Sequence, residues 1–231
     1  MVTKKLQIAI DGPVSAGKGT VSKLLAEKLG FLYVDTGAMY RAITYFIHSH
    51  KIDFADQAAI CKLLKLKKPQ VKLKKPQDDK KDGRLITVLL NTEDISWHIR
   101  TEAISKGTAI ITAYKCVRDY LVPQQQCIAR SQSVVMEGRD ITTRVLPQAD
   151  LKIYLDGSDQ VRAKRRHQQM LERGELVSFE EIHNYLKQRD HQDMHRQLDP
   201  LVQAPDSWLL DTTNMTISQV VDKICDKLKT I

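Results

Sequence analysis

Residues 11–20, Asp-Gly-Pro-Val-Ser-Ala-Gly-Lys-Gly-Thr, constrain this chain more than any other segment. They contain the spacing G-x-x-x-x-G-K of a phosphate-binding loop, with Gly12, Gly17 and Lys18 at the defining positions and Thr20 two residues later. Glycines suit such a loop because its backbone N–H groups must turn inward around a phosphate, where side chains would collide with it. The segment therefore predicts a nucleotide phosphate site. The alternative is a glycine-rich turn without a ligand.

The segments on either side of this loop have the patterns of a buried strand and of a helix. Residues 6–10, Leu-Gln-Ile-Ala-Ile, are apolar and partly β-branched, as expected for a strand of a parallel sheet. Residues 21–29 place apolar side chains at helical spacing, and Gly30 provides a stop signal. Such a helix directs the positive end of its dipole at a bound phosphate. We expect Lys18 to contact the β and γ phosphates of a nucleotide, and Thr20 to offer its hydroxyl to Mg²⁺.

Length and composition are those of a globular protein with one core. The chain has 231 residues, of which 42% are hydrophobic and 28% are charged. No apolar run reaches the roughly 18–20 residues of a membrane span. The first apolar stretch ends at Asp11, which is too early for the apolar centre of a signal peptide. We therefore expect a cytoplasmic protein without a membrane partner.

The four cysteines of the chain form no C-x-x-C pair. They are Cys61, Cys116, Cys127 and Cys225. Such scattered positions are typical of reduced thiols that are mostly buried. We expect neither a disulfide framework nor a zinc site among them.

Most of the net charge of +8 comes from a basic block at residues 62–100, which holds eleven Lys or Arg and five Asp or Glu. Such a block can bind nucleic acid, or it can be a solvated insert. No aromatic residue of the block precedes Trp97, so a platform for stacking bases is poorly supported. The hexapeptide Lys-Leu-Lys-Lys-Pro-Gln occurs at 65–70 and again at 72–77, and two copies are too few for a repeat fold. We expect no nucleic-acid partner.

Outside the basic block, strand and helix patterns alternate, as in an α/β fold with a parallel sheet. The expected strands are 6–10, 31–34, 133–136, 151–155 and 208–211. The expected helices are 21–29, 38–49, 54–64, 102–113, 115–130, 160–172, 179–196 and 217–228. Within the block, strands at 71–73 and 85–90 joined by a polar turn at 78–83 predict a small β insert.

Ligands of such folds gather at the carboxyl ends of the strands. The charged residues expected at these ends are Asp11, Asp35, Arg139, Asp140 and Asp156. After Asp35, Thr36 could cap the next helix and Arg41 could grip a phosphate with two guanidinium nitrogens; the alternative is an ordinary cap and a surface arginine. The pair Arg139–Asp140 indicates a site at the edge of the sheet, or else a structural ion pair.

The helix expected at 160–172 carries Arg162, Arg165 and Arg166 at spacings of three and four. Their charges repel one another unless an anion lies between them. This pattern predicts a mobile lid that closes on a donor nucleotide. The alternative is a solvated basic helix.

The helix expected at 179–196 places Arg189, Asp193 and Arg196 on one face. This face fits a binding surface, and it also fits a ladder of salt bridges. His191 and His195 are four positions apart, as two metal ligands could be. No H-E-x-x-H pattern and no third ligand accompany them, so we expect no zinc site.

Five segments stand out by their order and spacing: 10–20, 35–41, 91–101, 135–140 and 189–196. Together they resemble the bacterial-type cytidylate kinase family over nearly the whole chain. The resemblance implies a P-loop NTPase-type α/β fold, a three-layer sandwich with a five-stranded parallel sheet. It implies a kinase core at 1–63 and 101–231, a β insert that binds the nucleoside monophosphate at 64–100, and a helical lid at about 157–176.

The resemblance also implies direct transfer of the γ-phosphoryl group of ATP to CMP or dCMP, with Mg²⁺ and without a covalent intermediate. The residues implied in catalysis are Lys18, Arg139, Arg162, Arg166 and Arg189. Those implied in ATP binding are Gly12, Pro13, Val14, Ser15, Ala16, Gly17, Lys18, Gly19, Thr20 and Arg162. For CMP, the resemblance implies that the phosphate is bound by Arg41, Arg139 and Arg196. The sugar would be bound by Arg189 and Asp193, and the base by Arg118 and Asp140. Thr36, Tyr40 and Arg100 would be further lining of the pocket.

Three positions depart from the family pattern. Ala109, beside Thr108, stands where the family has a serine that touches the base, and Thr92 and Thr142 stand where it has glycines.

Two alternative functions stay open. A kinase for another acceptor, such as UMP, is disfavoured by an Arg–Asp pair suited to an amino-bearing pyrimidine. A nucleotide-controlled RNA-binding switch leaves the face at 189–196 without a role. We expect a monomer, because no apolar surface stripe is left over.

Overall fold

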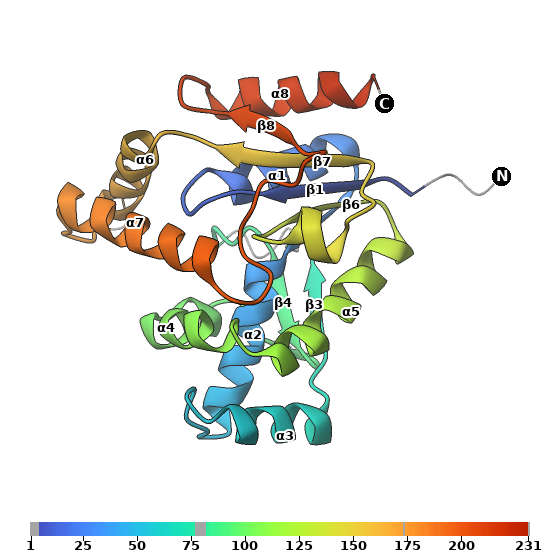
Figure 1. Ribbon diagram of the computed structural model, residues 1–231, viewed down its shortest axis with the longest axis vertical. Helices are drawn as coiled ribbons and strands as arrows, with labels where there is room; N and C mark the ends of the chain where they lie inside the picture. The colour runs from blue at the N-terminus through green and yellow to red at the C-terminus, as the bar shows by residue number, and fades with distance from the viewer. Residues whose placement is uncertain (1–4, 77–81, 173, 231) are drawn as a thin grey trace.

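The computed structural model describes residues 5–76, 82–172 and 174–230 (Figure 1). A five-stranded sheet runs through it in the order β2-β6-β1-β7-β8, and all its neighbouring strands are parallel. The strands are β1 (Gln7–Asp11), β2 (Leu32–Asp35), β6 (Val134–Glu137), β7 (Leu151–Asp156) and β8 (Trp208–Asp211). Each begins and ends within one residue of the expected segment, and the α/β fold with a five-stranded parallel sheet is confirmed.

The middle strand β1 lies between β6 and β7, and residues 8–10 have no exposed surface. This burial explains their apolar side chains, since both faces of a central parallel strand are covered. Asp11, at the end of β1, is also fully buried. Its carboxylate accepts hydrogen bonds from the backbone N–H of Ile141 at 2.9 Å and of Thr142 at 2.7 Å. Asp11 therefore fixes the turn after β6, although its place at a strand end had suggested a ligand contact.

Helices flank the sheet (Figure 1). They are α1 (Lys18–Leu29), α2 (Thr36–Ser49), α3 (Gln57–Lys67), α4 (Glu102–Ile111), α5 (Lys115–Ser131), α6 (Asp159–Leu171), α7 (Phe179–His195) and α8 (Ile217–Leu228). All were expected, but α3 begins three residues later than predicted, because Asp56 accepts a hydrogen bond of 2.9 Å from the N–H of Ala59 and so caps it. A 3-10 turn (His98–Arg100) and a π-helical turn (Ile141–Val145) complete the helical segments.

The basic block contains a second, antiparallel sheet in the order β3-β4-β5, as the small β insert predicted. Its strands are β3 (Val71–Lys74), β4 (Thr87–Leu90) and β5 (Glu93–Asp94). The short β5 was not expected, and β4 begins two residues later than the predicted strand. Part of the predicted turn at 78–83 lies outside the described residues. Alternate side chains of β3 and β4 join the main core, and the outward positions of β3 are the exposed Lys72 and Lys74.

Helices α6 and α7 lie side by side at one end of the sheet (Figure 1). They share a small core formed by Ala163, Ile182 and Leu186. Val14, from the loop after β1, packs against the same core. The predicted lid segment, which contains α6, and the neighbouring α7 therefore both contact the phosphate-binding loop.

The prediction of reduced cysteines without a disulfide was wrong for Cys61 and Cys116, whereas Cys127 and Cys225 are free. Cys61 of α3 and Cys116 of α5 form a disulfide, with their Cα atoms 5.7 Å apart, and Cys127 is exposed. Cys225 is half-buried. The 55 positions between Cys61 and Cys116 hid this pairing, because spacing along the chain does not show which helices meet. No helix in the described part of the chain is long and apolar enough to cross a bilayer.

Candidate functional site

A cavity of about 1280 Å³ opens at the carboxyl ends of the central strands. Its walls come from the phosphate loop, from the ends of β2 and β6, and from α4, α5, α6 and α7. The expected site residues that line it are Ser15, Ala16, Gly17, Lys18, Gly19, Thr20, Thr36, Tyr40, Arg41, Arg100, Arg118, Arg139, Asp140, Arg166, Arg189, Asp193 and Arg196. The expected residues outside its lining are Gly12, Pro13, Val14 and Arg162.

The phosphate loop has the backbone shape that its glycines predict. Gly17 has a φ of +93° and directly precedes α1, so the N–H groups of the first turn open toward the cavity. Gly12 has a φ of +152°, and a Cβ there would lie 2.0 Å from the carbonyl oxygen of Leu155. Only glycine fits this close approach of β1 to β7.

Lys18 is buried and curls back over the loop, where its ammonium donates hydrogen bonds to the carbonyls of Gly12 at 2.8 Å and Pro13 at 2.7 Å. Burial, together with repulsion from Arg139, lowers the pKa of Lys18 from 10.5 to about 7. An anion in the cavity would favour the charged form. The loop therefore holds an ammonium group that a polyphosphate would stabilise.

Glu137, the last residue of β6, was missed by the sequence reasoning, which ended this strand one residue earlier. Its carboxylate is buried beside Lys18 and accepts a hydrogen bond of 2.6 Å from the hydroxyl of Tyr33. A Cβ on Gly19 would lie 3.1 Å from Glu137 Oε1, so this carboxylate faces the loop. Burial raises the pKa of Glu137, and the negative charge of Asp35 raises it further.

Two arginines and one aspartate meet at the middle of the cavity. Arg139 Nε donates to the carboxylate of Asp193 at 2.7 Å, and Arg189 Nε lies 3.7 Å from the same carboxylate. Burial alone would raise the pKa of Asp193, but Arg139 and Arg189 hold it below its usual range. The salt-bridge ladder considered from the sequence is therefore present in part. The aspartate that forms it also orients two arginines whose remaining N–H groups line the cavity.

The pair Arg118 and Asp140 is buried at the far end of the cavity and forms a direct ion pair. Arg118 Nε also donates to Asp199 at 2.6 Å, and Arg196 Nη2 donates to Asp140 at 3.1 Å. The guanidinium of Arg118 lies 5.8 Å from the centre of the Tyr40 ring. The ring and the charges together line a polar part of the cavity. Asp199, whose φ is +45°, belongs to this network and was not foreseen.

The entry to α2 differs from its prediction. Asp35, not Thr36, caps the helix, since its carboxylate accepts a hydrogen bond of 2.8 Å from the N–H of Ala38. Thr36 is the first helical residue, and its hydroxyl donates to the carbonyl of Glu137 at 2.7 Å. Arg41 pairs with Asp35 at 3.0 Å and lines the cavity.

Near Ala109, which replaces a serine of the family pattern, other hydroxyl groups line the cavity. Thr108 and Thr112 belong to its wall, whereas Ala109 does not. Thr108 Oγ1 lies 2.8 Å from Thr44 Oγ1 and donates to the carbonyl of Ile104. Hydroxyls are thus present in this wall at Thr108, next to the position where the family has serine, and at Thr112, about one turn later. Across the cavity mouth, the guanidinium of Arg100 lies 5.6 Å from the centre of the Trp97 ring.

The three arginines of α6 do not share one environment. Arg162 is buried, pairs with Asp159 and, at 2.6 Å, with Asp190, and donates to the carbonyl of Val14 at 2.8 Å. Its charge is therefore balanced by carboxylates of the chain itself, although the sequence had suggested a bound anion. Arg165 donates to the carbonyl of Thr212 at 2.7 Å, and Arg166 lines the cavity.

Asp190 was not expected at the site. It is buried, and besides pairing with Arg162 it accepts a hydrogen bond of 2.8 Å from the backbone N–H of Val14. Its neighbours His191 and His195 stack with ring centres 4.1 Å apart. In the ranges 5–76, 82–172 and 174–230, no group of three or more His, Cys, Asp or Glu could hold a metal ion.

Comparisons with known proteins show which family this chain is similar to. The family model described as cytidylate kinase matches residues 8–230. A relative from Lactobacillus gasseri named cytidylate kinase is 42% identical over 221 residues, which are 96% of this chain and 93% of that protein. A relative of the same name from Bacillus subtilis strain 168 is 41% identical over 226 residues, covering 98% of this chain and 97% of that one.

A crystal structure of an uncharacterized protein from Eubacterium ventriosum aligns over 98% of this chain and 100% of that one, with a TM-score of 0.53 and 12% identity. At that identity the likeness concerns the fold alone. The family match and the two relatives extend over nearly the whole chain and include every segment that forms the cavity. The chain therefore belongs to the cytidylate kinase family.

Proposed function

We propose that this chain transfers the γ-phosphoryl group of ATP to CMP or dCMP, giving ADP and CDP or dCDP. The observation that carries the proposal is one cavity that joins a phosphate-binding loop to a ring of arginines and to the Arg118–Asp140 pair. Phosphoryl transfer needs its two anionic substrates in line and their charges neutralised. The cavity holds cations for both substrates and is continuous between them.

The donor end of the cavity is the loop around Lys18. Backbone N–H groups at the start of α1 would bind the β phosphate, and Lys18 would leave the carbonyls of Gly12 and Pro13 to reach the β and γ phosphates. Arg166, which lines the same wall, would approach the phosphates from α6. A contact of Arg162 with the phosphates stays a prediction, and it requires the ion pair with Asp190 to open.

The acceptor end is the pocket around Arg118 and Asp140. The carboxylate of Asp140 would accept from the 4-amino group of cytosine, and Arg118 would donate to the ring nitrogen or carbonyl oxygen. Arg41, Arg139 and Arg196 would bind the 5′-phosphate, and Arg189 with Asp193 would bind the sugar. Thr36, Tyr40 and Arg100 would complete the wall. UMP, with a carbonyl in place of the amino group, would leave Asp140 facing an acceptor.

The residues beside the loop suit Mg²⁺. This ion prefers oxygen ligands and is held by one or two carboxylates together with substrate phosphates. Thr20 offers a hydroxyl, and it lines the cavity together with the buried carboxylate of Glu137, whose pKa is raised by burial and by Asp35. When bound, Mg²⁺ neutralises charge on the phosphates that it contacts. Thr20 and Glu137 are the residues proposed to hold it.

The division into a core at 1–63 and 101–231, an insert at 64–100 and a lid at about 157–176 belongs to the same proposal, as do a monomeric state and a cytoplasmic location. Closure of the lid would exclude water, which would otherwise accept the phosphoryl group.

An assay that measures ADP formation from ATP with CMP, dCMP, UMP or AMP as the acceptor tests the proposal. We expect rapid ADP formation with CMP or dCMP; turnover fastest with UMP or AMP, or ADP formation that does not depend on a monophosphate, would contradict it.

A further inference from the structure

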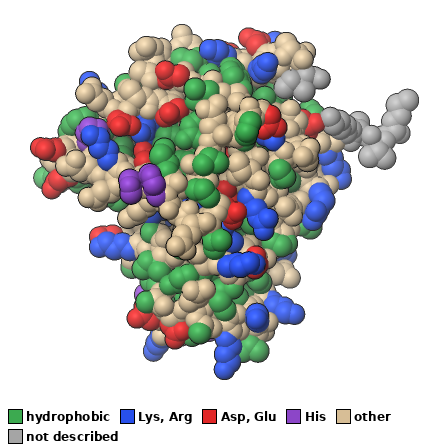
Figure 2. All heavy atoms as spheres, viewed as in Figure 1, with side chains coloured by type: hydrophobic (Ala, Val, Ile, Leu, Met, Phe, Trp, Pro, Cys, Tyr) green, Lys and Arg blue, Asp and Glu red, His purple; other side chains and the backbone are tan. Residues whose placement is uncertain are grey.

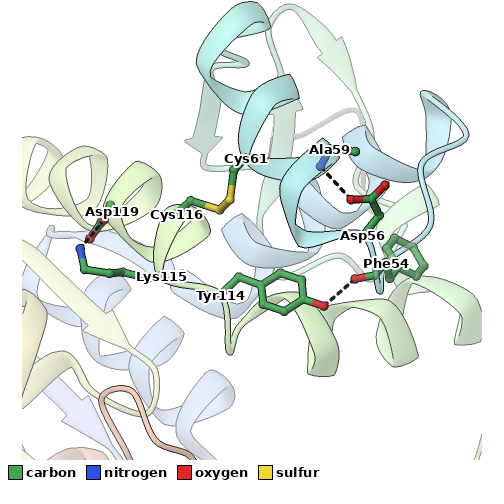
Figure 3. The surroundings of a disulfide bond; sticks show 8 residues. All are labelled: Phe54, Asp56, Ala59, Cys61, Tyr114, Lys115, Cys116 and Asp119. Carbon is green, nitrogen blue, oxygen red and sulfur yellow. Dashed lines mark hydrogen bonds and ion pairs between the residues drawn. A yellow bond between two sulfur atoms is a disulfide. The ribbon is translucent and has the colours of Figure 1, made fainter.

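The disulfide between Cys61 and Cys116 joins two segments that are otherwise held by hydrogen bonds. Cys61 lies in the second turn of α3 and Cys116 in the first turn of α5 (Figure 3). Beside it, the hydroxyl of Tyr114 donates to the carbonyl of Phe54 at 2.9 Å. The hydroxyl of Tyr120 donates to the carbonyl of Pro69 at 2.6 Å. The start of α5 is thus tied to both ends of α3, and the disulfide is the covalent part of that contact.

The disulfide lies in the wall of a second cavity, separate from the proposed nucleotide site. This groove, which we call the lysine groove, has a volume of about 840 Å³ and is lined by both cysteines. Cys61 and Cys116 are each half-buried and both line the groove, so the disulfide borders the space that a small molecule would occupy there. None of the residues that line the groove lines the nucleotide cavity.

The rim of the lysine groove is basic. Lys65, Lys68 and Lys72 are exposed and line it, and all three come from the repeated hexapeptide of the sequence. Within the described ranges none of them forms an ion pair, whereas the one acid of the rim, Asp119, pairs with Lys115 at 2.6 Å. Figure 2 shows Lys and Arg side chains at the end of the molecule where Figure 1 places α3. The groove therefore combines a disulfide in its wall with three cations that no described residue neutralises.

We propose that Cys61 and Cys116 form a reversible redox site whose co-reactant is a low-molecular-weight thiol bearing carboxylates, drawn into the groove by Lys65, Lys68 and Lys72. In reduction, a thiolate of the co-reactant attacks one sulfur of the disulfide, and the other cysteine leaves as a thiolate. A second co-reactant thiolate then attacks the mixed disulfide and releases the second cysteine. The disulfide and two small thiols thus give two cysteines and one small disulfide. Oxidation by the small disulfide is the reverse.

The chemistry of the groove favours such a partner. Nearby ammonium groups stabilise a cysteine thiolate, which is the form that reacts, and they attract a carboxylate-bearing thiol more strongly than a neutral one. The two exposed or half-buried cysteines elsewhere, Cys127 and Cys225, lie outside this groove. The site gives the repeated hexapeptide a role: it supplies the cations that select the co-reactant. None of this depends on which nucleotide the other cavity binds.

The test measures reduction of the full chain by two thiols that differ in charge. The oxidised protein is treated with glutathione, which carries carboxylates, or with 2-mercaptoethanol, which carries none, and free cysteines are alkylated and counted by mass over time. The variant Lys65→Gln, Lys68→Gln, Lys72→Gln removes the three cations of the groove. A matched control, Lys187→Gln, Lys223→Gln, Lys227→Gln, removes the same charge from exposed positions of α7 and α8.

We expect the glutathione rate constant to fall about three- to tenfold in the groove variant, and the 2-mercaptoethanol rate constant to stay nearly unchanged. The control variant should behave as the parent, and 0.5 M NaCl should reproduce the selective loss in the parent itself. Cys127→Ser, Cys225→Ser should leave reduction intact, and Cys61→Ser should abolish it. Equal loss with both thiols, equal loss in the control, or four free cysteines after incubation with glutathione disulfide would overturn the proposal.

Discussion

The carboxylate of Asp190 accepts a hydrogen bond of 2.8 Å from the backbone N–H of Val14, and so joins α7 to the phosphate-binding loop. The same carboxylate pairs with the buried Arg162 of α6, which donates in turn to the carbonyl of Val14. The backbone N–H and the carbonyl of one loop residue are thus satisfied by side chains from α7 and α6. These two helices therefore hold the loop in shape before any phosphate enters.

The first prediction concerns this link. Asp190→Asn keeps an oxygen for Val14 but removes the charge that balances Arg162 in a buried place, so we expect the free energy of unfolding to fall by about 3 kcal/mol. The KM for ATP should rise, because the loop loses its fixed position. Asp159→Asn is the control, since Asp159 pairs with Arg162 from a half-exposed position and should cost less than about 1 kcal/mol. Urea unfolding measures the free energy of unfolding of both variants. Equal losses of stability in Asp190→Asn and Asp159→Asn would contradict this account.

Lys18 is expected to matter for turnover and not for folding. Lys18→Met should lower kcat by at least about 100-fold, because a cation at the transferring phosphoryl group is lost. Stability should not fall, since burial already disfavours the ammonium. Lys23→Met, on the same helix but paired at the surface with Glu27, should change neither quantity. Steady-state kinetics and circular dichroism test this, and a near-normal rate for Lys18→Met would refute the assignment of the loop.

The lowered pKa of Lys18 gives a pH dependence with a definite sign. The unfolded chain binds a proton at Lys18 up to about pH 10, whereas the folded chain loses it near pH 7. Its contribution to the free energy of unfolding is therefore constant below about pH 7 and rises with pH between these values. A bound polyphosphate favours the charged form. We therefore expect ATP to bind with uptake of a proton at about pH 8, and to bind more weakly as the pH rises further.

Calorimetry in two buffers of different ionisation enthalpy measures that uptake. The difference in apparent binding enthalpy gives the number of protons bound with ATP. In Lys18→Met the uptake should vanish even where weak binding remains. Equal uptake in the variant and in the parent would assign the proton to another group.

Recognition of the base should depend on Asp140 more than on Asp199, although both pair with Arg118. Asp140→Asn changes a carboxylate that also binds Arg196, and it replaces an acceptor for the cytosine amino group by an amide that can donate. We expect kcat/KM for CMP to fall about 100-fold and the preference for CMP over UMP to shrink. Asp199→Asn should lower kcat/KM less and keep the preference. Steady-state kinetics of both variants with CMP and with UMP test this prediction. An equal loss of the preference for CMP in the two variants would contradict it.

The parts of the structure that were predictable are those set by local pattern. The strand residues 6–10 and the glycines at 12 and 17 constrain their own backbone, so the loop and the central strand follow from composition and φ requirements. The place of Lys18 at the start of the helix after the loop is equally local, whereas its hydrogen bonds to the carbonyls of Gly12 and Pro13 were not predicted. The cavity then follows from topology, because the carboxyl ends of parallel strands share one edge.

What the sequence could not show depends on side chains that meet across the fold. Asp190 and Asp199 look like ordinary charges of a helix and a loop, and only packing brings them to Val14 and Arg118. Arg162 has the pattern of a phosphate-binding residue, yet carboxylates of the chain take its charge. The disulfide was missed for the same reason, because the approach of α3 to α5 is a tertiary event.

The most direct measurement of the central claim is a crystal structure of the protein with CMP. The account predicts CMP with its cytosine between Arg118 and Asp140 and its phosphate among Arg41, Arg139 and Arg196, pointing toward Lys18. Cytosine bound elsewhere, a phosphate that touches none of these three arginines, or no binding at millimolar CMP would contradict it.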